Sequence, residues 1–286
     1  MNAGGDVPAD ESQPLPVGAP FNLLATARLL QRRPQNRVDR WDRGRYVRLI
    51  DTADGPRLLT VANAGTIDVP ALRLGVAGGP VSPATTRQAV AVARWILGLD
   101  APPAPTEWLG EIERRFGPVA AALRGFRPPC FPTLFETGAS VVPFQQVSLD
   151  AGTAIVGRLV TRFGSTSAVG GGEAFAFPAP AAIAATPLAA LRDVGLSRAK
   201  AAALQTLAER ALAGDLDAAR LQAAPAAEAL AALQALPGIG PWSAGVMLLR
   251  GLRRMDVFPT GDVGAARNLP HLLGLDANWS PAEASA

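Results

Sequence analysis

The chain has 286 residues, with 27 lysines and arginines against 24 aspartates and glutamates, for a formal net charge of +3. This length can bury a substantial core and fits two ordinary domains better than one. The single cysteine, Cys130, excludes an intramolecular disulfide and any four-cysteine metal or iron–sulfur site. Neither a leader peptide nor a stretch of about 20 apolar residues occurs, so we expect a soluble, cytoplasmic protein without membrane contact.

The first hundred residues predict a small α+β domain. Residues 1–17 are rich in glycine, proline and acidic groups, and we expect a disordered tail there. The domain then spans residues 18–105 and ends in the proline-rich run 101–105. Its predicted elements are a helix at 21–30, strands at 45–50 and 57–62 around a turn at 52–55, a third strand at 71–76, and a helix at 84–99.

Residues 106–286 predict a helical domain, so the expected fold class is α+β, mainly an α-helical bundle behind a small α+β domain. The alanine-rich run 199–235 is broken at Gly214 and Pro225, which indicates short packed helices instead of a coiled coil. Residues 170–172 are three glycines that predict a mobile loop, because no strand or phosphate-loop signature accompanies them. The predicted helices span 107–115, 119–123, 134–142, 149–163, 179–185, 197–213, 226–236, 242–252 and 263–273.

A glycine-bracketed turn joins the helices of residues 226–252. Gly238 and Gly240 can both adopt a positive φ, so the chain can reverse tightly around Ile239. Pro241 suits the first turn of the second helix, whose unpaired N–H groups then face outward. Such a helix-hairpin-helix motif predicts contacts to DNA phosphates through the backbone at Gly238, Ile239 and Gly240.

Asp262 lies 22 residues past Gly240, directly before the predicted helix 263–273. An aspartate in this place is either a helix N-cap or a catalytic acid, and the two roles do not exclude each other. Asp256 is the rival acid, but its position after two arginines favours a salt-bridged loop residue. His271, the single histidine, is expected to be a surface or packing residue.

The order of these motifs resembles that of the helix-hairpin-helix DNA glycosylases, and it is close to the 3-methyladenine DNA glycosylase II branch. The resemblance covers most of the chain. Besides the hairpin and Asp262, it rests on the blocks at 20–24, 33–41, 134–137, 145–148, 177–180 and 191–200.

The resemblance implies a monofunctional enzyme of base excision repair, active as a monomer on double-stranded DNA near the nucleoid. It would flip an alkylated base out of the duplex and hydrolyse the N-glycosidic bond, with Asp262 stabilising the oxocarbenium-like sugar. A positively charged base such as 3-methyladenine departs neutral, so no general acid is needed. No cofactor is expected, although a monovalent ion at the hairpin fits the family.

The resemblance also assigns the remaining site residues. Trp242 occupies the position at which lyase-competent relatives carry a nucleophilic lysine, and it either stacks on the flipped base or packs the hairpin to the bundle. Gln146 falls on the position of the wedge that fills the gap in the duplex, with Gln145 beside it, or both are solvated turn residues. Further expected pocket residues are Val246 and Phe144, and further phosphate contacts are Ser243 and Arg250.

Three departures from the family pattern leave other functions open. Pro143 and Phe144 alter the usual run before Gln145, and Val246 replaces a pocket tyrosine. The sequence also ends at Ala286, where family members usually continue, so part of the domain is expected to be missing. The alternatives are a degenerate helix-hairpin-helix protein that binds DNA without catalysis, and a glycosylase for oxidised bases that also cuts the strand.

Overall fold

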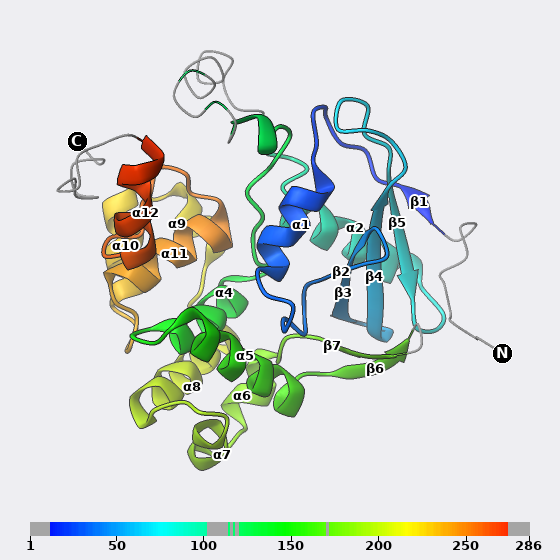
Figure 1. Ribbon diagram of the computed structural model, residues 1–286. Coiled ribbons are helices and arrows are strands. Elements are labelled where there is room, and N and C mark those ends of the chain that lie inside the picture. Colours follow the sequence, from blue (N-terminus) through cyan, green and yellow to red (C-terminus); the bar gives the residue numbers. More distant parts are fainter. Residues whose placement is uncertain (1–11, 102–113, 115–116, 118–119, 170–171, 274–286) are drawn as a thin grey trace.

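An antiparallel sheet forms the first part of the protein. The computed structural model describes residues 12–101, 114, 117, 120–169 and 172–273. Five strands pair in the order β1-β5-β4-β3-β2, and helices α1 and α2 pack on one face of the sheet (Figure 1). The three predicted strands, the turn between β3 and β4 and both helices are confirmed. The bounds are β1 Gln13–Pro14, α1 Leu23–Gln31, β2 Arg40–Asp42, β3 Arg45–Thr52, β4 Gly55–Asn63, β5 Leu72–Ala77 and α2 Pro83–Leu97.

The chain joins the sheet earlier than expected. Strand β1 pairs with β5 through Gln13↔Leu74 and Pro14↔Arg73, and Leu15 is only 1% exposed. The prediction of a disordered tail to residue 17 was therefore wrong from residue 12 onward, because one buried leucine and two paired residues suffice to fix a polar segment to a sheet edge. Residues 1–11 lie outside the described residues.

The second part is helical, which confirms the predicted fold class. The predicted boundary at 101–105 and the predicted helix at 107–115 lie mostly outside the described residues. Of the predicted helix 119–123, residues 120–122 are helical and the chain turns from residue 123. In the described part, no helix is both long and apolar enough to cross a membrane. The bounds are α4 Leu134–Val141, the 3₁₀ helix η2 Val142–Phe144, α5 Leu149–Phe163, α6 Pro180–Ala184, α7 Leu188–Asp193, α8 Arg198–Leu212, α9 Ala218–Ala223, α10 Ala226–Gln234, α11 Pro241–Leu252 and α12 Val263–Leu273.

A β-hairpin interrupts the helices where the sequence predicted a mobile loop. Strands β6 (Thr166–Val169) and β7 (Gly172–Phe175) pair antiparallel, so the prediction for the glycine run was wrong at Gly172. Residues 170 and 171 lie outside the described part. The hairpin packs on the sheet face opposite α1 and α2, where Ala174 and Ala176 contact apolar side chains of β3 and β4. It extends from the helical part across the sheet, as Figure 1 shows.

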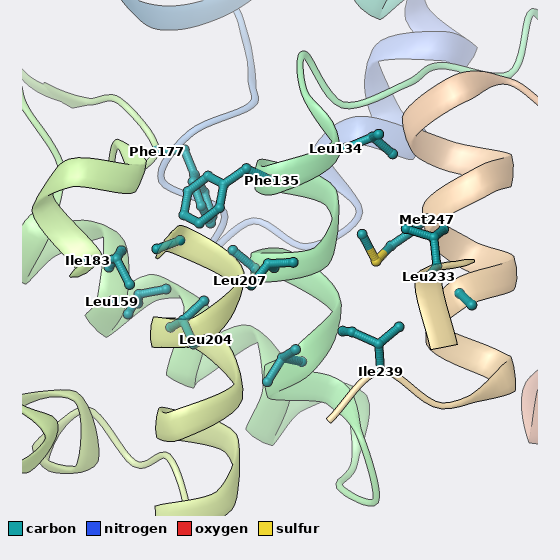
Figure 2. Packing of buried hydrophobic residues seen from close by; sticks show 14 of the residues in the cluster. Leu134, Phe135, Leu159, Phe177, Ile183, Leu204, Leu207, Leu233, Ile239 and Met247 are labelled. Carbon is teal, nitrogen blue, oxygen red and sulfur yellow. The ribbon is translucent and has the colours of Figure 1, made fainter. Parts of the chain in front are cut away.

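Helix α4 forms the centre of the helical core, with α8 on one side and α11 on the other (Figure 2). Gly138 permits this close packing, because a Cβ atom there would lie 2.6 Å from Leu207 of α8 and 3.1 Å from Met247 of α11. Phe135 and Phe177 pack edge to face, with ring centroids 6.4 Å apart. The core thereby fixes α11, the second helix of the predicted DNA-binding motif, against α4.

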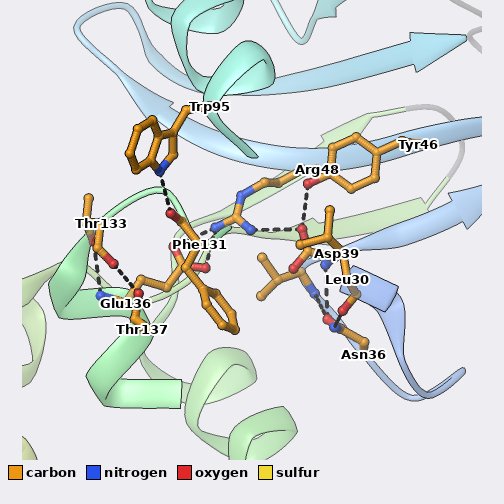
Figure 3. A network of polar contacts seen from close by, with 11 residues as sticks. Leu30, Asn36, Asp39, Tyr46, Arg48, Trp95, Phe131, Thr133, Glu136 and Thr137 are labelled. Carbon is orange, nitrogen blue, oxygen red and sulfur yellow. Dashed lines mark hydrogen bonds and ion pairs between the residues drawn. The ribbon is translucent and has the colours of Figure 1, made fainter. Parts of the chain in front are cut away.

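A buried polar network joins the two parts of the protein (Figure 3). Arg48 on β3 donates to Asp39 at 2.9 Å and to both carboxylate oxygens of Glu136 on α4 at 2.5 and 2.6 Å. Tyr46 donates to the same Asp39 at 2.6 Å. Burial raises the pKa of Glu136, and the Arg48 guanidinium opposes this shift. The charge of Arg48 is therefore neutralised inside the protein.

Removing the Arg48 guanidinium should destabilise the fold strongly. Arg48→Met leaves two buried carboxylates without a cation, and we expect it to lower the free energy of unfolding by about 3–5 kcal/mol. The matched control is Arg210→Met, which breaks the half-exposed Arg210–Asp215 pair and should cost about 0.5 kcal/mol or less. Urea denaturation measures both, and equal losses would contradict a structural role for the network.

Candidate functional site

A single cleft of about 1430 Å³ contains every site residue that the sequence predicted. One wall is the segment 29–39, from the end of α1 to Asp39. The other wall consists of α4, η2, α11 and the hairpin between α10 and α11. The predicted residues on its surface are Phe144, Gln145, Gln146, Gly238, Ile239, Gly240, Trp242, Ser243, Val246, Arg250 and Asp262. The chain therefore brings together residues that are up to 118 positions apart (262 − 144).

The hairpin between α10 and α11 uses its two glycines differently. Gly238 has φ +79°, and a Cβ atom there would lie 2.4 Å from the Cβ of Ala203. Gly240 has φ −87° and ψ 179°, so it does not use the positive φ that glycine permits, and a Cβ atom would meet open space. Ile239 is 4% exposed, which leaves its backbone as the part available to a ligand.

The first turn of α11 presents unsatisfied donors to the cleft. Gly240 is the N-cap of this helix and offers no side-chain hydrogen bond, and Pro241 follows at the first position. The free N–H groups at a helix start, together with the positive end of the helix dipole, attract an anion. The backbone of the hairpin can therefore accept an anion such as a phosphate.

Asp262 is fixed at both carboxylate oxygens. Its Oδ1 accepts the backbone N–H of Ala265 at 2.8 Å, which confirms that it caps α12. Its Oδ2 accepts the indole N–H of Trp242 at 3.0 Å. A carboxylate with both oxygens held in this way, at the start of a helix and on the wall of a cleft, places a defined negative charge where a ligand can reach it.

The predicted pocket residues surround this carboxylate from α11 and η2. Trp242 and Val246 are one turn apart on α11, and both are partly exposed to the cleft. Trp242 does more than stack or pack, because its N–H group fixes the orientation of Asp262. Phe144 packs on α5 at Gly152, where a Cβ atom would lie 2.2 Å from the ring.

The wedge loop, defined here as residues 143–147, runs from within η2 toward the start of α5. Gln146 is exposed and has φ +54°. Gln145 turns the other way and donates its amide N–H groups to the Gly238 carbonyl at 2.8 Å and to the Ser243 hydroxyl at 2.9 Å. The Ser243 side chain is 2% exposed, so the prediction that its hydroxyl contacts phosphate was wrong.

The Arg250 guanidinium, predicted to contact phosphate, also contacts the protein itself. It donates to the Pro129 carbonyl at 3.0 Å and lies over the Phe131 ring. Burial lowers its pKa. Asp256 pairs with Arg254 at 2.6 Å, as expected for a salt-bridged loop residue. The arginines that do line the cleft are Arg32, Arg33 and Arg37, in addition to Arg250.

The sequence reasoning missed Lys200. Its ammonium donates to the backbone carbonyls of Pro143 and Gln145 in the wedge loop. One signal was available, because Lys200 is the single lysine of a chain that otherwise uses arginine. The described residues contain no group of three or more His, Cys, Asp or Glu side chains that could hold a metal ion.

Comparison with known proteins identifies the family. The model for "HhH-GPD superfamily base excision DNA repair protein" matches residues 139–286, which include α5, the hairpin and Asp262. The chain belongs to this superfamily. A curated relative, DNA-3-methyladenine glycosylase 2 of Escherichia coli (strain K12), is 32% identical over 154 residues, which are 54% of each chain. The chain spans about half the length of the curated relatives that it matches most strongly.

Solved structures of the superfamily share the whole fold. The 3-methyladenine DNA-glycosylase from Archaeoglobus fulgidus superposes with a TM-score of 0.75 at 22% identity, over 91% of this chain and 86% of that one. The 8-oxoguanine glycosylase/lyase of Clostridium acetobutylicum reaches 0.70 at 14% identity, over 96% and 89%. Enzymes with different chemistry therefore share this architecture, and the site residues must distinguish between them.

The two hairpin glycines should respond differently to a methyl group. Gly238→Ala forces a positive φ on alanine and overpacks Ala203, so it should lower the free energy of unfolding by about 2–4 kcal/mol. Gly240→Ala keeps an ordinary φ and points into open space, so its effect should be roughly 0.5 kcal/mol or less. Thermal unfolding of the two variants tests this difference. A large loss of stability in Gly240→Ala would show that the hairpin geometry is not as described.

Proposed function

We propose that the protein is a monofunctional DNA glycosylase that hydrolyses the N-glycosidic bond of alkylated bases of the 3-methyladenine type. The observation that carries this proposal is the position of Asp262, with both oxygens fixed, in the cleft that the hairpin amides also line. The named relative from Escherichia coli, a DNA-3-methyladenine glycosylase, supports the substrate class. The functional unit is a monomer bound to double-stranded DNA.

The chemistry follows from one fixed negative charge. Departure of the base leaves an oxocarbenium-like sugar, and a carboxylate beside the anomeric carbon stabilises the charge that develops only in the transition state. Asp262 can also orient the attacking water. An alkylated purine is already cationic and departs neutral, so the site needs no general acid. No cofactor takes part, and an ion at the hairpin would serve only to bind phosphate.

Trp242 supports this chemistry as a positioning residue. Its indole N–H holds Oδ2 of Asp262 while the backbone N–H of Ala265 holds Oδ1, so the carboxylate cannot rotate freely. Trp242 also lines the cleft and is partly exposed, so its electron-rich ring can attract a cationic base. A single tryptophan thereby combines base recognition with orientation of the catalytic acid.

Base release tests the roles of both residues. In single-turnover assays on methylated DNA, Asp262→Asn should release 3-methyladenine roughly 10²–10³-fold more slowly than the wild type, because it removes the charge that faces the sugar. Trp242→Phe keeps an aromatic ring but loses the hydrogen bond, and a loss of about tenfold is expected. Asp256→Asn, which alters only the exposed partner of Arg254, should leave the rate unchanged.

The same assay separates the proposal from its rival. Equal release by wild type and Asp262→Asn would remove this carboxylate from the mechanism. No release by the wild type, with binding to duplex DNA intact, would instead identify a helix-hairpin-helix protein that recognises DNA without cleaving the bond.

Borohydride trapping should give no covalent adduct with damaged DNA. A lyase needs an amine that attacks the sugar, and Trp242 stands where lyase-competent relatives place that lysine. Lys200 is the single lysine of the chain. Its ammonium is hydrogen-bonded to the wedge loop, and it is not among the residues that line the cleft. A trapped adduct on DNA that carries an oxidised base would assign the protein to the strand-cleaving class instead.

A further inference from the structure

Lys200 differs from the other basic residues of the chain in its residue type. It is the single lysine among 27 lysines and arginines. The hydroxyl of Ser197, which caps α8, accepts the backbone N–H of Lys200 at 3.3 Å and so fixes the first turn of this helix. The side chain then extends from α8 toward the wedge loop.

The Lys200 ammonium binds the wedge loop at two points. It donates to the carbonyl of Pro143 at 3.2 Å and to the carbonyl of Gln145 at 2.5 Å. Both carbonyls lie where η2 ends, and the last carbonyls of a helical segment lack partners within it. A compact ammonium with three tetrahedral donors can reach two separate carbonyls from a single nitrogen atom, whereas a guanidinium is larger and planar.

The charge of Lys200 has no acidic partner in the described part of the chain, since no carboxylate lies within ion-pair distance. Partial burial lowers its pKa. The protein therefore keeps a partly desolvated cation whose contacts are two neutral carbonyls. Such an arrangement contributes to the shape of the loop and not to the balance of charge.

Gln145 continues the connection on the far side of the loop. Its amide donates to the Gly238 carbonyl and to the Ser243 hydroxyl, which belong to the hairpin and to α11. Hydrogen bonds from Lys200 thus join the backbone of the wedge loop to α8, and the side chain of Gln145 joins the loop to the hairpin. Gln146 is the next residue, with a positive φ and an exposed side chain.

We propose that Lys200 is a positioning residue for base extrusion, which holds the wedge loop so that Gln146 enters the duplex while the hairpin grips the strand. This inference rests on the proposed glycosylase function. Filling the gap left by a flipped base offsets part of the energy of unpairing and unstacking. If the wedge loop moved freely between conformations, Gln146 would fill the gap less often and would offset less of this energy.

The dependence on base pairing distinguishes this role from a merely structural one. Lys200→Met keeps the apolar stem and loses both hydrogen bonds. It should slow single-turnover release about tenfold when the damaged base is fully paired, as expected for a change of about 1.4 kcal/mol. On the same lesion in a mismatch or in single-stranded DNA, where extrusion costs less, the loss should be twofold or smaller, again as an order-of-magnitude estimate.

Two further variants separate position from charge. Lys200→Arg keeps the positive charge near DNA but changes the donor geometry, and its rate on paired DNA should stay close to that of Lys200→Met. Full recovery would show that any cation at this position suffices and that the ammonium geometry is not required, which would overturn the proposal. Arg198→Met removes an exposed charge from the same helix and should preserve the wild-type rate on both substrates.

The remaining outcomes are also decisive. Equal loss on paired and unpaired DNA would overturn the positioning role and leave the proposed function intact. No release by the wild type on either substrate would instead contradict the proposed function. Thermal unfolding accompanies each assay, and if Lys200→Met does not fold, Lys200→Gln carries the same comparison.

Discussion

The buried charge of Arg48 is the interaction on which the arrangement of the protein depends. The guanidinium lies in the sheet, yet one of its two carboxylate partners is on α4 of the helical part. A buried cation cannot be left unpaired without a large penalty, so sheet and helix must meet in one position. Asp39 and Glu136 both line the cleft, and the network therefore also sets how far apart its walls stand.

Helix ends organise the chemistry inside this cleft. The start of α11 offers unpaired amides to a phosphate, and the start of α12 places Asp262 where its carboxylate is held by a backbone amide and by Trp242. In the proposed function, binding and catalysis use the same physical property, the positive end of a helix dipole, applied once to an external anion and once to an internal one. The close contact of α11 with α4 keeps the two helix starts in a fixed relation.

Local signals in the sequence predicted the elements well, whereas the directions of side chains required the fold. Helix α5 begins where Ser148 caps it and ends at Phe163, as expected, because caps act within a single turn. The β6–β7 hairpin could not be foreseen, since its apolar partners belong to strands about a hundred residues earlier. Ser243, Met247 and Arg250 recur at the helical period and therefore share one face of α11. Their residue types, two polar and one apolar, did not reveal this shared direction.

The single lysine has a practical consequence for experiments. Reagents that modify primary amines distinguish lysine from arginine, so they address only one side chain of this protein. An isotopic methyl label or a small fluorophore at Lys200 would report directly on the wedge loop, without the background that many surface amines cause in other proteins. Its signal could follow, in real time, whether the loop changes its environment when a damaged duplex binds.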